Sequence, residues 1–150
     1  KLRGLIMTIE NSESIIGQEK FQIDINEFKK SNLSFNFLVI DKFFQDSSRN
    51  SELMSLTNSE LFIEIAKIDK NMDDMPEDHL LKKFVLPGTS LIEAVFRILI
   101  LNGNKPMDIS EMEENLKKAW ATVIYLKSYT TETISQMLNV SNEYFITYVD

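Results

Sequence analysis

The side chains best suited to binding chemistry lie near the end of the chain, in a polar segment with helical spacing that starts at Thr130 or Thr131. Glutamine and asparagine can bind the edge of adenine through two hydrogen bonds, and serine and threonine hydroxyls can bind phosphate. We therefore take the outward positions of this segment as candidate contacts to DNA or to a protein partner. They are Thr131, Glu132, Thr133, Ser135, Gln136 and Asn139.

Cations are scarce around these residues. From Ser128 to Asp150 there is no lysine or arginine, and the whole chain carries 16 basic against 23 acidic residues, a formal net charge of −7. Because phosphate neutralisation supplies most non-specific affinity for DNA, such a surface starts at a disadvantage. Lys117, Lys118 and Lys127 complete the candidate site as phosphate contacts. The first two also end a predicted helix, where positive charge complements the helix dipole without any ligand.

Catalytic and metal-binding chemistry finds little support in the sequence. His79 is the single histidine and cysteine is absent, so a conventional transition-metal site has no ligand set. The acidic run from Asp69 to Asp78 fails the EF-hand pattern, because Asp74 stands where the sharp-turn glycine belongs and Leu80 where the bidentate glutamate belongs. Neither a Gly-x-Ser-x-Gly turn nor a glycine-rich phosphate loop is present. We expect no enzymatic activity and no cofactor; a small-molecule enzyme is the third alternative, which carboxylates gathered around His79 would favour.

The second half of the chain predicts the elements that position the candidate site. Ser90 to Glu93 reads as a capping box, and the apolar run after it predicts a helix buried on most sides, with a Glu93–Arg97 ion pair on its narrow polar edge. Asn102-Gly103 ends that helix, and a short extended piece follows at Pro106–Asp108. Asp108, or Ser110 together with Glu113, caps a second helix with one apolar face, a third helix follows, and Tyr144–Val149 reads as a strand. The apolar face of the second helix comprises Ile109, Met112, Leu116, Ala119 and Trp120.

This order of helix, short strand, helix, helix and strand resembles the winged-helix family. The resemblance covers residues 87–150 and is closest to the type found in HARE-HTH domains and bacterial RNA polymerase delta subunits. It implies that the third helix and the wing contact a macromolecule. The second wing strand has no counterpart, which leaves open a continuation beyond Asp150. The residues that carry the resemblance are Ala94-Val95 in the first helix, Lys105-Pro106-Met107 as the short strand, Ile109–Leu116 as the second helix, and Gln136–Phe145 as the end of the third helix and the start of the wing.

The first half gives a mixed pattern. Apolar residues predict strands at Leu5–Ile9 and around Phe21–Ile25, whereas Phe35–Phe44 fits both a strand and a helix period. Thr57 to Glu60 is a further capping box before a helix. Too few basic residues are interleaved with the aromatic ones for stacking on nucleic acid, so we expect them in the core. They are Phe21, Phe28, Phe35, Phe37, Phe43, Phe44 and Phe62.

Together these patterns predict an α+β fold in which a mixed α/β segment, residues 1–78, packs on a winged-helix-like domain, residues 79–150. The 43% hydrophobic and 26% charged content is typical of a globular domain, and the absence of cysteine and of a visible signal peptide fits a cytoplasmic location. We expect a binding protein, an adaptor in transcription or a related process, whose partner is a protein of basic character. A DNA-binding regulator is the alternative. A homo-oligomer is left open, and no membrane partner is expected because the longest apolar run is too short to span a bilayer.

Overall fold

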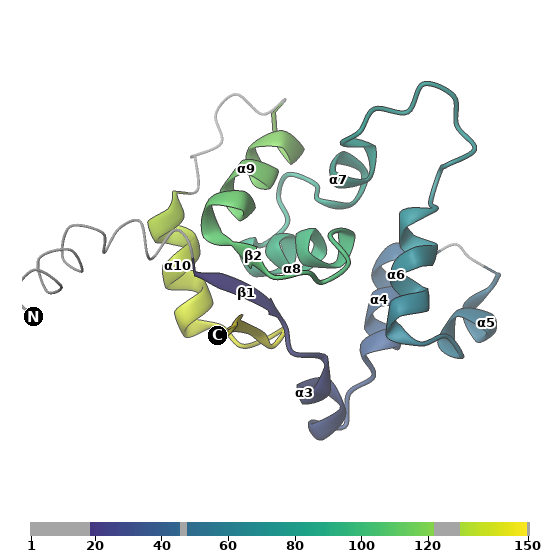
Figure 1. Ribbon diagram of the computed structural model, residues 1–150, viewed down its shortest axis with the longest axis horizontal. Helices are drawn as coiled ribbons and strands as arrows, with labels where there is room; N and C mark the ends of the chain where they lie inside the picture. The colour runs from purple at the N-terminus through teal and green to yellow at the C-terminus, as the bar shows by residue number, and fades with distance from the viewer. Residues whose placement is uncertain (1–18, 46–47, 122–129, 150) are drawn as a thin grey trace, which may run out of the picture.

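The computed structural model describes residues 19–45, 48–121 and 130–149. In these ranges the chain has an α+β fold that combines helices with a small three-stranded antiparallel sheet (Figure 1). In chain order the elements are β1 (Lys20–Ile23), α3 (Ile25–Lys30), α4 (Phe35–Phe43), α5 (Asn50–Met54), α6 (Asn58–Ala66), α7 (His79–Phe84), α8 (Leu91–Leu101), β2 (Met107–Asp108), α9 (Ile109–Ala119), α10 (Thr131–Val140) and β3 (Ile146–Val149).

Helix α8 lies at the centre of the hydrophobic core, as its sequence predicts. It is in contact with α6, α7, α9, α10 and β1 (Figure 1). Only Leu91, Glu93, Arg97 and Leu101 are partly exposed along it, and its other side chains are buried. Because burial of apolar surface is the main favourable term in folding, α8 is the element on which these five elements pack.

Strand β1 lies in the middle of the sheet, between β2 and β3 and antiparallel to both. Lys20 is opposite Asp108 on one side and Val149 on the other. A strand from the beginning of the described chain is therefore hydrogen-bonded to two strands from its second half. The predicted boundary near residue 78 stays a prediction, but the described core takes residues from both sides of it.

A buried side chain extends the hydrogen bonding of β1. The Asn104 amide accepts a hydrogen bond from the Ile23 N–H at 2.8 Å and donates one to the Ile23 carbonyl at 2.9 Å. The loop after α8 brings Asn104 into place through two residues in the left-handed region, Gly103 with φ 69° and Asn104 with φ 56°. Glycine and asparagine tolerate this conformation better than other residues. The Asn104 side chain thus supplies the pairing that a longer β2 strand would have made with β1.

Several local predictions are confirmed in the described ranges. The Thr57 and Glu60 side chains form both hydrogen bonds of a capping box. Of the two alternatives for the cap of α9, the structure shows Asp108 and not Ser110, because Asp108 accepts the Glu111 N–H at 2.8 Å. The segment Phe35–Phe44, which fitted two periods, is mainly the helix α4, with Ser34 as its cap. The strand predicted at Leu5–Ile9 lies outside the described residues.

Two expectations are wrong. Ser90 accepts the Glu93 N–H at 3.4 Å, but the Glu93 carboxylate does not complete the predicted capping box, because it is bonded to Lys42 and Tyr144 instead. Phe37 was expected in the core with the other aromatic residues, yet 63% of it is exposed. The reason is that α4 buries Phe35, Val39, Ile40 and Phe43, which leaves Phe37 on the opposite side of the helix.

Candidate macromolecule-binding surface

The six predicted polar contact residues all lie on α10, at the outside of the molecule (Figure 1). The helix begins where the Thr130 hydroxyl accepts the Thr133 N–H, and it turns Ile134 and Leu138 into the core. This orientation directs the polar side chains outward. Glu132, Thr133, Gln136 and Asn139 are exposed, and Thr131 and Ser135 are half-buried.

Strand β3, which follows α10 in the chain, also carries exposed residues, and we call the exposed residues of these two elements and of the segment between them the α10–β3 surface. Val140 at the end of the helix is 86% exposed, and Tyr148 on the strand is 55% exposed. The Tyr148 ring packs edge-on against Phe21 with 6.0 Å between centroids, which holds it in place at the edge of the sheet. The α10–β3 surface therefore combines amides and hydroxyls with one large apolar side chain and one anchored aromatic ring.

The charges of the α10–β3 surface and of neighbouring α9 are mainly negative. From Ile109 to Val149, the described residues include five glutamates and two lysines. Both lysines, predicted as phosphate contacts, form ion pairs along α9: Lys117 with Glu113 at 2.9 Å and Lys118 with Glu114 at 3.6 Å. These exposed pairs add little stability, but they place a carboxylate beside each lysine. Lys127 lies outside the described residues, so the structure does not place it relative to α10.

A partly buried charged cluster lies where α4, α8 and the segment before β3 meet. The Lys42 ammonium donates to Glu93 Oε1 at 2.6 Å, the Tyr144 hydroxyl donates to the same oxygen at 3.1 Å, and Arg97 Nε is 3.4 Å from Glu93 Oε2. Burial raises the pKa of Glu93, but Lys42, Tyr144 and Arg97 outweigh it, so the pKa lies below its usual value. Burial and the Glu93 charge raise the pKa of Tyr144 well above its usual value, which keeps the hydroxyl protonated.

This cluster positions the start of β3. Tyr144 stacks on Phe96 of α8 with 4.4 Å between centroids, so its bond to Glu93 attaches the segment before β3 to the central helix. The sequence indicated only the Glu93–Arg97 pair, whose spacing of four residues is a local signal, and that pair is confirmed. Lys42 is distant in sequence from its partners, so no spacing rule could have identified it.

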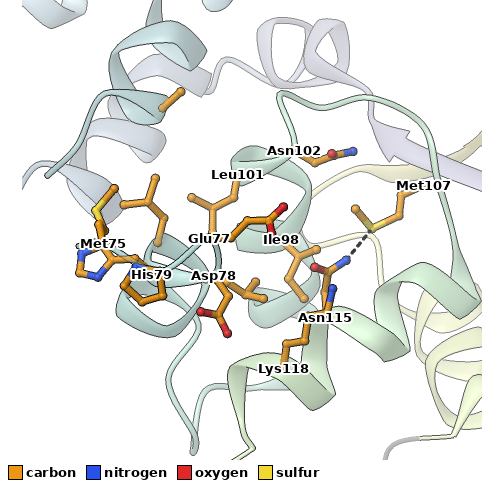
Figure 2. Close-up of a pocket in the computed structure, with 14 residues that line it drawn as sticks. Met75, Glu77, Asp78, His79, Ile98, Leu101, Asn102, Met107, Asn115 and Lys118 are labelled. Carbon is orange, nitrogen blue, oxygen red and sulfur yellow. Dashed lines mark hydrogen bonds between the residues drawn. The ribbon is translucent and has the colours of Figure 1, made fainter. Parts of the chain in front are cut away.

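A second candidate site is a cleft of about 580 Å³ that involves α7, α8 and α9 (Figure 2). Its apolar lining includes Ile98, Leu101 and Met107, and its polar lining includes the side chains of Asn115 and Lys118. Figure 2 shows Asn115 directed toward the Met107 sulfur, at 4.0 Å. The volume lies within the range of small-molecule sites, so the cleft is where the enzyme alternative must be tested.

His79 lies at one end of this cleft, beside Met75 (Figure 2). Its Nε2 atom is 2.8 Å from Asp69 Oδ2, and the Lys83 ammonium donates to the same oxygen at 2.6 Å. Hydrogen bonds from Lys83 and then from His79 lower the pKa of Asp69, so this carboxylate is held as an anion rather than poised to exchange protons near neutrality.

Glu77 and Asp78 line the cleft together with His79. The cleft therefore has carboxylates near its histidine, which is the feature that would favour an enzyme. However, none of the described residues that line it carries a hydroxyl or a thiol, so covalent catalysis through such a nucleophile is not supported there. Among the described residues, no group of three or more histidine and carboxylate side chains is placed so that it could bind a metal ion.

Comparison of the chain with protein families, with characterised proteins and with solved structures gives no match. Over the ranges that the structure describes, no helix combines the length and apolarity needed to cross a bilayer. The α10–β3 surface and the cleft must therefore be interpreted from their own chemistry.

Proposed function

We propose that this protein is a non-catalytic binding module whose winged-helix-like second half docks a basic segment of a partner protein on α10 and β3. The observation that carries this proposal is the charge of the α10–β3 surface. Between Thr130 and Val149 the only ionised side chains are Glu132 and Glu143, both exposed, beside exposed amides and hydroxyls. Lysine and arginine side chains form charge-assisted hydrogen bonds with such carboxylates, which are stronger than bonds between neutral groups.

The order of the elements supports the winged-helix interpretation. Helix α8, strand β2, helices α9 and α10, and strand β3 follow one another as in that family, and α10 packs on both α8 and α9. β1 lies beside β3 and antiparallel to it, in the position where the second strand of a wing would pair. In this proposal the first half of the chain completes the wing, and the partner is a component of the transcription machinery or of a similar assembly, as the family resemblance implies.

The charges favour a protein partner over DNA. A duplex on α10 would meet Glu132 and Glu143, and the described lysines nearest in sequence, on α9, each have a carboxylate beside them. Phosphates are repelled by such a surface, and few counterions would be released on binding. Val140 and Tyr148 add an apolar contact and an aromatic anchor of the kind enriched at protein interfaces. Thr133, Gln136 and Asn139 would then bond to peptide groups rather than to bases.

The test is a fluorescence anisotropy titration with two probes, a labelled lysine- and arginine-rich peptide and a labelled random duplex DNA, at low salt. We expect the peptide to bind, and Glu132→Lys combined with Glu143→Lys to weaken its binding about tenfold, since two exposed charge contacts are each worth about 0.5–1 kcal/mol. The matched control, Asp73→Lys with Glu77→Lys, makes the same change of net charge in the exposed segment before α7 and should affect binding much less.

Two results would overturn the proposal. Binding of the DNA at micromolar protein, without binding of the peptide, would show the DNA-binding alternative to be correct. Peptide binding that falls equally in the α10–β3 variant and in its control would show that net charge, and not this surface, attracts the peptide.

A further inference from the structure

Exposed apolar side chains gather around α4 and α5, on the opposite side of the molecule from α10 in the view of Figure 1. Phe37 is 63% exposed, Leu33 53% and Met54 43%. Isolated exposed apolar residues are ordinary, but a contiguous group on a small domain indicates a surface that is covered by something else.

Two shallow hollows show that these residues form one continuous strip. Met54 lines both hollows, one of about 280 Å³ that it shares with Lys29 and Leu33, and one of about 220 Å³ that it shares with Phe37 and Asp41. Met54 therefore lies where the two hollows meet, with Lys29 and Leu33 in one hollow and Phe37 and Asp41 in the other. We call these five residues the α4–α5 patch.

The two ends of the α4–α5 patch carry opposite charges. Lys29 and Asp41 are both exposed, and neither takes part in the ion pairs formed among the described residues. Two other basic residues of this half of the chain do form ion pairs: Lys30 Nζ is 3.2 Å from Glu27 Oε1, and Arg49 Nη2 is 3.0 Å from Glu52 Oε1. An apolar strip with a cation at one end and an anion at the other is complementary to a copy of itself turned through 180°.

We propose that the α4–α5 patch is the contact of a twofold-symmetric homodimer, with a second copy of this chain as its occupant. The twofold axis passes near Met54 and lies across the strip, so that Lys29 of each copy meets Asp41 of the other. Phe37 of each copy then faces the hollow beside Leu33 of the other. Such an interface uses the same surface twice and closes without leaving a free patch, as in most soluble homodimers. This inference does not depend on the proposed function of the α10–β3 surface.

The charges also favour a second copy over an unrelated partner. A uniformly basic segment would be attracted to Asp41 but repelled by Lys29, and an acidic one would be repelled by Asp41. A partner must carry the opposite pair of charges around an apolar centre, and the same chain supplies that arrangement without further assumption.

The first test is disulfide trapping at the proposed axis. The chain has no cysteine, so Met54→Cys introduces a single thiol that would face its own copy. A disulfide needs Cβ atoms about 4 Å apart, so we expect oxidised Met54→Cys to form a covalent dimer at least tenfold faster than the control Ile63→Cys. Ile63 is the matched control because it is 54% exposed on α6 and lines neither hollow of the patch. Equal rates for the two variants would overturn the proposal.

The second test is a charge exchange followed by sedimentation equilibrium. Lys29→Asp or Asp41→Lys alone places like charges opposite each other at both ends of the contact, and we expect each to weaken dimerisation by about fivefold to tenfold. The double variant restores both attractions and should recover the dimerisation of the unmodified protein. Because both residues are exposed, circular dichroism should show folded protein in every case. A protein that stays monomeric at about 100 µM, above the dissociation constants expected for specific dimers, would overturn the proposal, as would a double variant without recovery.

Discussion

Asn104 is the residue whose replacement gives the sharpest test of the fold, because a single side chain satisfies both backbone groups of Ile23. Those groups lie at a position that is only 1% exposed while the amide is in place, so they lose their partners when it is removed. Leaving a buried N–H or carbonyl unpaired costs about 1–3 kcal/mol, and two are involved. We therefore expect Asn104→Ala to lower the free energy of unfolding by about 2–4 kcal/mol. The measurement is urea unfolding followed by circular dichroism, with the slope m compared between variants.

Two further variants separate the loss of the hydrogen bonds to Ile23 from the effect of backbone strain at position 104. Asn104→Gly removes the side chain but keeps a residue that accepts φ 56°, so it should recover only the part of the loss caused by backbone strain, about 1 kcal/mol. Asn71→Ala changes an exposed asparagine in a turn and should alter stability by less than about 0.5 kcal/mol. If Asn104→Ala costs no more than Asn71→Ala, the Ile23 groups find other partners, and Asn104 does not hold β1 in the sheet.

Further predictions concern the Glu93 cluster and α10. Glu93→Gln should destabilise the protein at neutral pH by about 3 kcal/mol, because it leaves the largely buried Lys42 charge without its partner. The lowered pKa of Glu93 stabilises the fold above the ordinary carboxyl pKa, and this contribution is lost as the pH falls below about 4.3, so urea midpoints measured from pH 6 to 3 should fall less steeply in the variant. Tyr144→Phe should cost about 1 kcal/mol near neutrality. The raised pKa of Tyr144 stabilises the fold below the ordinary tyrosine pKa, so stability should be lost as the pH rises above about 10 in the unmodified protein and less so in Tyr144→Phe. Leu138→Ala, on the buried side of α10, should cost about 2–4 kcal/mol in thermal or urea unfolding, whereas exposed Val140→Ala should leave stability almost unchanged; equal losses would contradict the orientation of α10.

Features encoded within a few residues could be predicted from the sequence. The cap formed by Thr57 and Glu60 depends on two side chains three positions apart, and the outward face of α10 follows from the helical spacing of Ile134 and Leu138. The pairing of Lys117 with Glu113 belongs to the same class, since both lie on one helix at a spacing of four residues.

Features that depend on distant parts of the chain could not be predicted. Asn104 reads as an ordinary turn residue, and its role appears only when the backbone of Ile23 lies beside it. Glu93 matched a capping box, but an ammonium group from α4 competes for its carboxylate. Phe37 is a related case. The segment Phe35–Phe44 fits the residue spacing of both a strand and a helix, so its hydrophobic pattern does not show which side chains face the core. The α4–α5 patch was therefore missed, although every residue in it was visible in the sequence.

The central place of β1 has a consequence for biosynthesis. The ribosome makes β1 before every other described element, yet both of its neighbours in the sheet, β2 and β3, come from the second half of the chain. At synthesis rates of about 5–20 residues per second, Phe21 and Ile23 wait on the order of ten seconds before β3 has been made. The sheet therefore closes only after β3 has been made, and the apolar residues of β1 are accessible to chaperones until then. Pairing over such long sequence separation also predicts slower folding than the helical content of the chain suggests.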